Sequence, residues 1–258
     1  MLIPLSDDDR QLYRPTWLTN TFLALNIVVF VVQLLLPNFT ASYSAVPLEI
    51  TTGQDLIGVS AVARPDGGTV EIPQGPGPRP VFLTLITAMF MHGDWLHIGG
   101  NLLFLWIFGN NVEHRFGSKR FFAFYLGSGL AAGLAHTFLD PQSQIPMLGA
   151  SGAISGILGA YLVLFPRNIV KVLIFLWIIP VPAFVVIGLW IASQMIGGAG
   201  MLAEMVNNQI PTEGVSYGAH LGGLLAGLSL GLLFRFRMKE EPENVFYRKL
   251  PPPLPRAS

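Results

Sequence analysis

Cysteine is absent from the 258-residue sequence, which excludes disulfide bonds, thiol catalysis and cysteine-based metal sites. Charge is scarce, because only 12% of the residues are charged, about half the share in a typical soluble domain. The formal net charge is zero, so no overall field favours nucleic acid as a partner. Hydrophobic residues make up 52% of the chain, and the mean hydropathy is +0.55. This composition predicts a membrane protein whose partner is the lipid bilayer.

The N-terminus lacks the features of a secretory signal peptide. The opening MLIPLSDDDRQLYRP is polar and acidic, with no basic, apolar and cleavage regions in order. We expect the first apolar segment to direct insertion and a bacterial inner (cell) membrane to hold the protein. The acidic run Asp7–Asp9 is expected to be part of a solvated tail.

Six segments are apolar enough to cross a bilayer, which takes about 20 residues of helix. The fourth is short, and Pro180 and Pro182 are expected to kink the fifth. The segments cover about 17–36, 95–112, 121–138, 149–165, 172–196 and 217–236. They predict an all-α membrane protein built as a six-transmembrane-helix bundle.

The basic residues orient this bundle. With the N-terminus inside, 13 of the 15 Lys and Arg residues fall in inner segments, and only Arg64 and Arg79 lie outside. Both termini are therefore expected to be cytoplasmic. The predicted organisation is a cytoplasmic N-terminal segment at 1–16, a membrane domain at 17–236 and a cytoplasmic, proline-rich tail at 237–258.

The loop between the first two helices, about 37–80, is long beside the other connections. Within it, VSAVARPDGGTVEIP places the turn signal PDGG between two arms of high β propensity. This pattern predicts a β-hairpin on the outer side.

The stretch GASGAISG begins the fourth segment. Gly149, Gly152 and Gly156 lie three and four residues apart, so they share one helix face, with Ser151 at its edge. One interpretation is a packing surface of small residues between membrane helices. The other is a catalytic serine, and this stretch alone leaves both open.

The stretch GAHLGGLLAG begins the sixth segment and repeats the pattern. His220 shares a face with Gly223 and Gly227. Packing between two glycine faces would bring His220 to Ser151. An isolated histidine also serves as a hydrogen-bonding contact between helices, but ionisable groups within a membrane are costly and indicate function.

The stretch MHGDWLHIGGNLL begins the second segment. His97 and Asn101 lie four residues apart and share a face, and His92 precedes the helix. These side chains either bond across helices or form an oxyanion hole, in which fixed donors meet a developing negative charge. His92 is expected to assist, or to cap a re-entrant turn.

Topology connects the three stretches. His97, Ser151 and His220 all fall near the start of helices that run inward, so they are expected at the same shallow depth below the outer surface. A serine needs a base to take its proton, and His220 is suited to that role. No acidic residue lies at that depth to orient the base. A Ser–His dyad is therefore predicted, in which packing or an uncharged donor orients the ring and Ser155 is a candidate to assist.

These motifs resemble those of the rhomboid family of intramembrane serine proteases. The resemblance covers about 83–234 and rests on GASG, AHLGGLLAG and HGDWLHIGGNLLFLWIFGNNVEHRFG. It implies a nucleophile at Ser151, a general base at His220 and oxyanion contacts from His97, Asn101 and the Ser151 N–H. It also implies that His92 lines the pocket, that Gly149 belongs to the serine motif, and that Gly152, Gly156, Gly223 and Gly227 pack helices. The implied activity is cleavage of transmembrane segments of single-pass proteins near their outer ends, without a metal or cofactor.

Two features depart from the family pattern. Leu83–Thr84 stands where members often carry Trp-Arg, and Ser155 stands where an aromatic residue often packs on the histidine. Glu113 and Arg115 match a Glu-x-Arg pattern at the inner end of the second helix. They are expected to form an ion pair or a backbone contact far from Ser151, and His114 and His136 are expected to be structural.

Two other function classes compete with the protease. One is a catalytically silent relative that binds membrane-protein clients, although such proteins typically lose the serine or the histidine. The other is a transporter, which would need charged groups at mid-membrane depth. A zinc intramembrane protease is excluded because the motif HExxH is absent.

Overall fold

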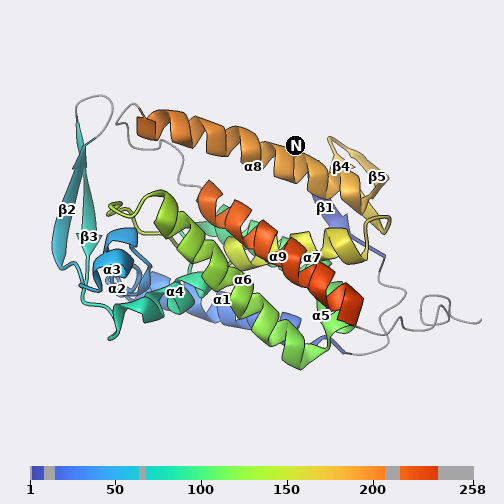
Figure 1. The fold of residues 1–258 in the computed structure, drawn as a ribbon, viewed down its shortest axis with the longest axis horizontal. Coiled ribbons are helices and arrows are strands. Elements are labelled where there is room, and N and C mark those ends of the chain that lie inside the picture. The colour runs from blue at the N-terminus through green and yellow to red at the C-terminus, as the bar shows by residue number, and fades with distance from the viewer. Residues whose placement is uncertain (1, 9–14, 64–67, 207–215, 238–258) are drawn as a thin grey trace, which may run out of the picture.

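A computed structural model describes residues 2–8, 15–63, 68–206 and 216–237, and it is dominated by a bundle of long helices (Figure 1). Five of the six expected helices lie within a few residues of their predicted bounds. The long helices are α1 (Trp17–Leu35), α5 (Trp95–Phe116), α6 (Ser118–Leu139), α7 (Ser151–Leu164), α8 (Ala183–Val206) and α9 (Tyr217–Arg237).

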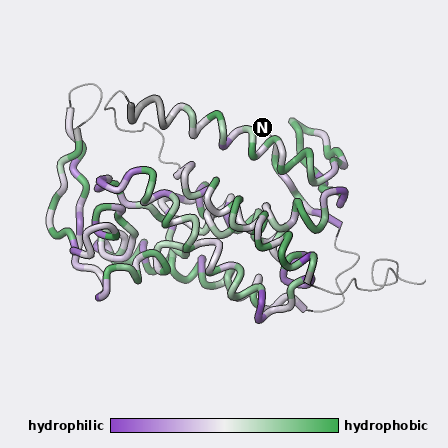
Figure 2. Tube along the Cα trace, viewed as in Figure 1, coloured by the Kyte–Doolittle hydropathy of each residue, from purple (hydrophilic) through white to green (hydrophobic). Residues whose placement is uncertain are grey.

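Four helices, α1, α6, α8 and α9, are long and apolar enough to cross a membrane. Residues 81–90 and α5 meet this criterion together but are bent by 79° at the break between them. Hydrophobic residues colour most of the length of these helices (Figure 2). The protein is therefore an integral membrane protein of mostly helical structure.

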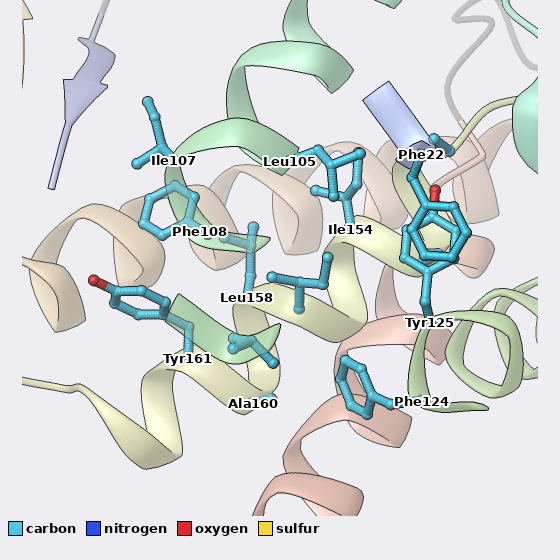
Figure 3. Packing of buried hydrophobic residues seen from close by; sticks show 14 of the residues in the cluster. Phe22, Leu105, Ile107, Phe108, Phe124, Tyr125, Ile154, Leu158, Ala160 and Tyr161 are labelled. Carbon is cyan, nitrogen blue, oxygen red and sulfur yellow. The ribbon is translucent and has the colours of Figure 1, made fainter. Parts of the chain in front are cut away.

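The short helix α7 lies at the centre of the bundle. Its 14 residues span about 21 Å, less than the hydrocarbon core, and residues 152–161 are all buried. Its side chains pack in one cluster with those of α5 and α6, as Figure 3 shows for Ile154, Leu158 and Tyr161. Across the same core, the rings of Phe22 and Tyr125 stack at 4.2 Å. This packing holds the N-terminus of α7 on a rigid base.

The fifth segment differs from the prediction of a kinked helix over 172–196. Residues 169–182 form a hairpin of β4 (Ile169–Ile174) and β5 (Trp177–Pro182), and α8 begins only at Ala183. The prediction was wrong because a short apolar run rich in Ile and Val suits a strand as well as a helix. Pro180 and Pro182 lie in β5, an edge strand, where a residue without an N–H is tolerated.

The N-terminal residues also form a strand, so the all-α prediction requires correction. Strand β1 (Leu2–Ser6) pairs antiparallel with β4, giving the order β1-β4-β5. The prediction of a solvated tail at Asp7 is wrong as well. Asp7 Oδ2 accepts hydrogen bonds of 2.6 Å from Asn111 Nδ2 and from the Tyr161 hydroxyl. Asp9 and the tail at 238–258 lie outside the described residues.

The hairpin predicted between the first two helices is confirmed, and its place on the outer side stays a prediction. Strands β2 (Gly58–Ala63) and β3 (Thr69–Gln74) pair antiparallel, while the turn between them lies outside the described residues. The two small sheets lie at opposite ends of the bundle (Figure 1). The rest of the segment between α1 and α5 holds α2 (Phe39–Tyr43), α3 (Pro47–Thr52), η1 (Val81–Leu83), α4 (Thr84–Thr87) and η2 (Ala88–Phe90).

Glu113 makes the backbone contact that its position predicts. Its buried carboxylate accepts from the N–H groups of Leu18 and Thr19, at 3.0 and 2.7 Å, and from the Thr19 hydroxyl at 2.8 Å. The Ser118 hydroxyl donates to it as well, at 2.8 Å. The first N–H groups of a helix have no partner within the helix, so Glu113 caps α1 from α5. It thereby fixes α1 to the helix that carries His97.

Candidate active site

Ser151 is the first residue of α7 and follows a tight loop. Gly149 in that loop has φ +133°, a conformation that side-chain-bearing residues rarely adopt. A β-carbon at Gly149 would lie 2.8 Å from His97 Nε2 and 3.4 Å from Ser151 Oγ. The Gly149 N–H donates to the carbonyl of Ala88 at 2.9 Å. Because Gly149 has no side chain, the His97 ring and the Ser151 hydroxyl can both lie next to its Cα.

His220, in the first turn of α9, contacts Ser151 directly. The distance between His220 Nε2 and Ser151 Oγ is 2.7 Å, across 69 residues of sequence. At this distance the hydroxyl is able to donate its proton to an unprotonated Nε2.

Glycines allow α7 and α9 to approach closely enough for this contact. A β-carbon at Gly223 would lie 2.0 Å from the carbonyl oxygen of Gly152, and one at Gly227 would lie 1.9 Å from that of Gly156. The Cα atoms of Gly152 and Gly156 in α7 face α6 instead. Added β-carbons at Gly152 and Gly156 would meet Ala132 Cβ at 2.6 Å and Ser128 Cβ at 2.4 Å. The backbone of α7 therefore lies in close contact with two neighbouring helices, α6 and α9.

A cavity of about 590 Å³ opens beside the serine and the histidine. Asn101 of α5 lines it, is 8% exposed, and its Nδ2 has no hydrogen-bond partner among the described residues. An unpaired buried donor is costly unless a ligand completes its hydrogen bonds. The cavity is also lined by Asp94, His97, Ser151, Ser155, Trp190 and His220.

The ring of His97 is oriented as a donor toward the serine. Its Nδ1 accepts a long hydrogen bond, 3.4 Å, from the N–H of Gly93. In a neutral imidazole the proton then resides on Nε2, the atom next to Gly149. Asp94, the N-cap of α5, accepts from the N–H groups of Leu96 and His97 at 2.8 Å each. The His97 N–H thereby lowers the pKa of the Asp94 carboxyl, an effect that the Leu96 N–H reinforces.

His92 lies behind His97 and is only 2% exposed. The two rings meet edge to face with centroids 5.1 Å apart. Gln33 of α1 binds the backbone of His92 twice, accepting from its N–H at 2.9 Å and donating to its carbonyl at 3.1 Å. His92 is not among the residues that line the cavity, so its ring supports His97 from the rear.

The other ring nitrogen of His220 faces α8. Nδ1 lies 2.6 Å from Gln194 Oε1, and Gln194 is 8% exposed. The expected orienting group, Ser155, instead donates its hydroxyl to the carbonyl of Ser151 at 2.6 Å. Gln194 was not predicted from the sequence, because its partner lies 26 residues away. A polar residue in an apolar helix is nevertheless a signal that could have indicated it. Within the described parts of the chain, no group of three or more His, Asp and Glu side chains is placed to hold a metal ion.

Comparison with known proteins identifies the family. The Rhomboid domain family matches residues 79–237, which is most of the chain and includes α5 to α9. The chain belongs to the rhomboid family.

The relatives of this rhomboid come from several compartments. It is 32% identical over 153 residues to Rhomboid protein 1, mitochondrial, of Saccharomyces cerevisiae, a match that covers 58% of this chain and 41% of that protein. It is 31% identical over 171 residues to Rhomboid-like protein 11, chloroplastic, of Arabidopsis thaliana, which covers 64% and 58%. A shorter match, 41% identical over 78 residues, is with Rhomboid protease GluP of Bacillus subtilis, covering 30% and 15%. The chain thus spans about half the length of the first two relatives.

One of these relatives is named a protease, and the names together do not indicate a bacterial membrane. Relatives named mitochondrial and chloroplastic stand beside a bacterial one. The bacterial inner membrane therefore stays a prediction.

Proposed function

We propose that this rhomboid is an intramembrane serine endopeptidase that acts through a dyad of Ser151 and His220. The observation that carries the proposal is the 2.7 Å contact between Ser151 Oγ and His220 Nε2. The cavity beside this pair supports it further, because a substrate carbonyl needs access to the hydroxyl.

The reaction begins when Ser151 Oγ attacks the carbonyl carbon of a peptide bond and its proton passes to His220 Nε2. The tetrahedral intermediate carries a negative oxygen, for which His97 Nε2, Asn101 Nδ2 and the Ser151 N–H serve as donors. The intermediate collapses when the imidazolium gives its proton to the leaving amine. A water molecule then attacks the carbonyl of the acyl-enzyme while His220 takes one of its protons. The bond from the carbonyl carbon to Ser151 Oγ breaks, the carboxyl product leaves, and His220 returns the proton to Oγ. No step requires a metal or cofactor.

The orphan donor of Asn101 supports the oxyanion role. A donor left unpaired and buried in the resting protein is available for a charge that exists only in the transition state. His92 assists by fixing the position of the His97 ring from behind.

We further propose that the substrates are single-pass membrane proteins, cut in their transmembrane segments near the outer face. In this arrangement six helices cross the membrane or reach into it, with both termini cytoplasmic and the segment 37–80 outside. The shared position of Ser151, His97 and His220 in the first turns of their helices supports a shallow site that water reaches from outside.

The alternative is a silent relative that binds membrane-protein clients through the same cavity. A fluorophosphonate probe separates the two, since it reacts with an activated serine and spares an inert one. Purified wild type should be labelled at Ser151, mapped by mass spectrometry, and His220→Ala should lose at least about 100-fold of the labelling rate. Absence of labelling in folded wild type would favour the client-binding protein.

A further inference from the structure

We infer that Gln194 of α8 is a positioning residue that holds the His220 ring in the tautomer and orientation needed for a base. This inference rests on the proposed function, because it concerns the same serine and histidine. Helix α8 thereby helps to align Ser151 of α7 with His220 of α9.

A continuous series of hydrogen bonds runs from the serine to the backbone of α8. Ser151 Oγ lies 2.7 Å from His220 Nε2, and His220 Nδ1 lies 2.6 Å from Gln194 Oε1. Gln194 Nε2 donates to Ser193 Oγ at 3.1 Å, and the Ser193 hydroxyl donates to the carbonyl of Trp190 at 2.6 Å.

The far end of this series determines its direction. The Trp190 carbonyl only accepts, so the Ser193 hydroxyl uses its single proton there and accepts from Gln194. Gln194 must then present Nε2 to Ser193 and Oε1 to His220. An oxygen facing Nδ1 requires the proton of the neutral ring on Nδ1, which leaves Nε2 free to accept from Ser151.

The position of Gln194 in α8 shows that the contact is specific. Gln194 is 8% exposed, whereas the neighbouring Met195 and Ile196 are 56% and 76% exposed on the outer surface of the bundle. A polar side chain that turns inward from a membrane helix is stabilised only when its hydrogen bonds are made. In the described part of the site no carboxylate takes this place, so a neutral amide does the orienting work that an acid does in soluble triads.

The arrangement makes the alignment of the base depend on α8. Ser151 and His220 are held together by the backbone-close packing of α7 and α9. The ring of His220 is still free to rotate about its own bonds unless Nδ1 is held. Packing supplies part of that restraint, since the Trp190 and His220 rings lie 6.0 Å apart. Among the described residues, Gln194 is the hydrogen-bond partner of Nδ1 and so selects the tautomer.

Three variants test this role. Gln194→Met keeps the size of the side chain and removes the acceptor, Gln194→Glu keeps an acceptor, and Ser193→Ala keeps the glutamine but frees its amide to flip. Met195→Leu, one residue along and exposed, is the matched control. Each is reconstituted in liposomes and measured for fluorophosphonate labelling of Ser151, for kcat and KM on a single-pass reporter, and for the tautomer of His220 by ¹⁵N NMR.

We expect Gln194→Met to lower the labelling rate and kcat at least about tenfold while KM changes less than about twofold. The ¹⁵N spectrum should move from a proton on Nδ1 to a mixture of tautomers. Gln194→Glu should retain activity within about threefold of wild type, and Ser193→Ala should fall between the two. Met195→Leu should match wild type.

A wild-type labelling rate and spectrum in Gln194→Met would overturn the inference. So would equal losses in the Met and Glu variants with the His220 tautomer unchanged, because Gln194 would then only join two helices. Where Gln194→Met does not fold, Ser193→Ala replaces it as the test. A wild-type labelling rate and a wild-type His220 tautomer in Ser193→Ala would contradict the proposal that Ser193 directs the amide of Gln194. Absence of both labelling and cleavage in wild type refutes the proposed function instead.

Discussion

His97 Nε2 leaves no room for a side chain on Gly149, because a β-carbon there would lie only 2.8 Å from this nitrogen. Residue 149 is glycine, and its backbone has φ +133°. Two independent constraints, one of space and one of conformation, thus require the first glycine of GASG. The stretch GASGAISG therefore combines a packing face with a loop that shapes the site.

Gly149→Ala should lower kcat about 100-fold, because the added methyl group displaces the His97 ring or the serine loop. Fluorophosphonate labelling of Ser151 and reporter turnover measure the loss. Gly99→Ala, on α5 where a β-carbon meets nothing within 4 Å, is the control and should keep wild-type turnover. Full activity of the Gly149 variant would mean that this loop tolerates a side chain and does not shape the site.

Gly227→Ala should destabilise the protein by about 1–3 kcal/mol, because the new methyl group would overlap the Gly156 carbonyl of α7. Separation of α7 and α9 should also lengthen the contact between Ser151 and His220 and lower turnover in the folded fraction. Thermal unfolding in detergent, with turnover measured below the transition, tests both effects. Gly188→Ala on α8 has open space and should leave Tm unchanged or raise it. Equal Tm values for the two variants would contradict the close packing of α7 and α9.

Glu113→Ala should lower the free energy of unfolding by about 2–4 kcal/mol, because the first N–H groups of α1 lose their cap in a buried place. The residue lies at the far end of α5 from His97, so turnover of the folded protein should change little. Glu71→Ala, in the exposed face of β3, is the matched control. A large loss of turnover without a loss of stability would assign Glu113 a role beyond the cap.

Glu49 of α3 should make the segment between α1 and α5 sensitive to pH. Burial raises the pKa of this carboxyl above 4.5, Asp55 adds to the rise, and the hydrogen bond from the Leu56 N–H opposes it. A carboxyl with a raised pKa in the folded state stabilises the fold most below its unfolded pKa. Stability is lost as the pH rises through the folded pKa. Thermal scans from pH 4 to 8 should therefore show Tm falling in wild type and a flatter profile in Glu49→Gln; parallel profiles would refute this contribution.

Much of the helical framework was predictable because each helix carries a local signal. The apolar lengths of α1, α6 and α9 predicted their bounds, and the turn signal PDGG predicted the β2–β3 pairing. The glycine spacing of α9 predicted the face that it turns to α7, where Gly223 and Gly227 lie against the carbonyls of Gly152 and Gly156. The spacing did not predict that the Cα atoms of Gly152 and Gly156 face α6. The structure brings Ser151 and His220 together at this contact of α7 and α9. These features depend on periodicity and turn chemistry, which neighbouring residues determine.

The misses depend on partners that are distant in sequence. Strands β4 and β5 were mistaken for helix because an apolar run does not reveal its pairing, and β4 pairs on its other edge with β1 from the start of the chain. Asp7 appeared solvated because its partners, Asn111 and Tyr161, lie more than 100 residues away. Gln194 was overlooked because only the fold shows that its side chain turns toward His220.

Cleavage of a membrane-protein reporter tests most simply whether Ser151 is the nucleophile of an intramembrane protease. Wild type and Ser151→Ala would be incubated in liposomes with a single-pass protein that carries small residues near its outer membrane boundary. The products would then be mapped by mass spectrometry. We expect one cut near that boundary by wild type and none by the variant. Undiminished cleavage by Ser151→Ala would show that another group is the nucleophile and that the proposed dyad is wrong.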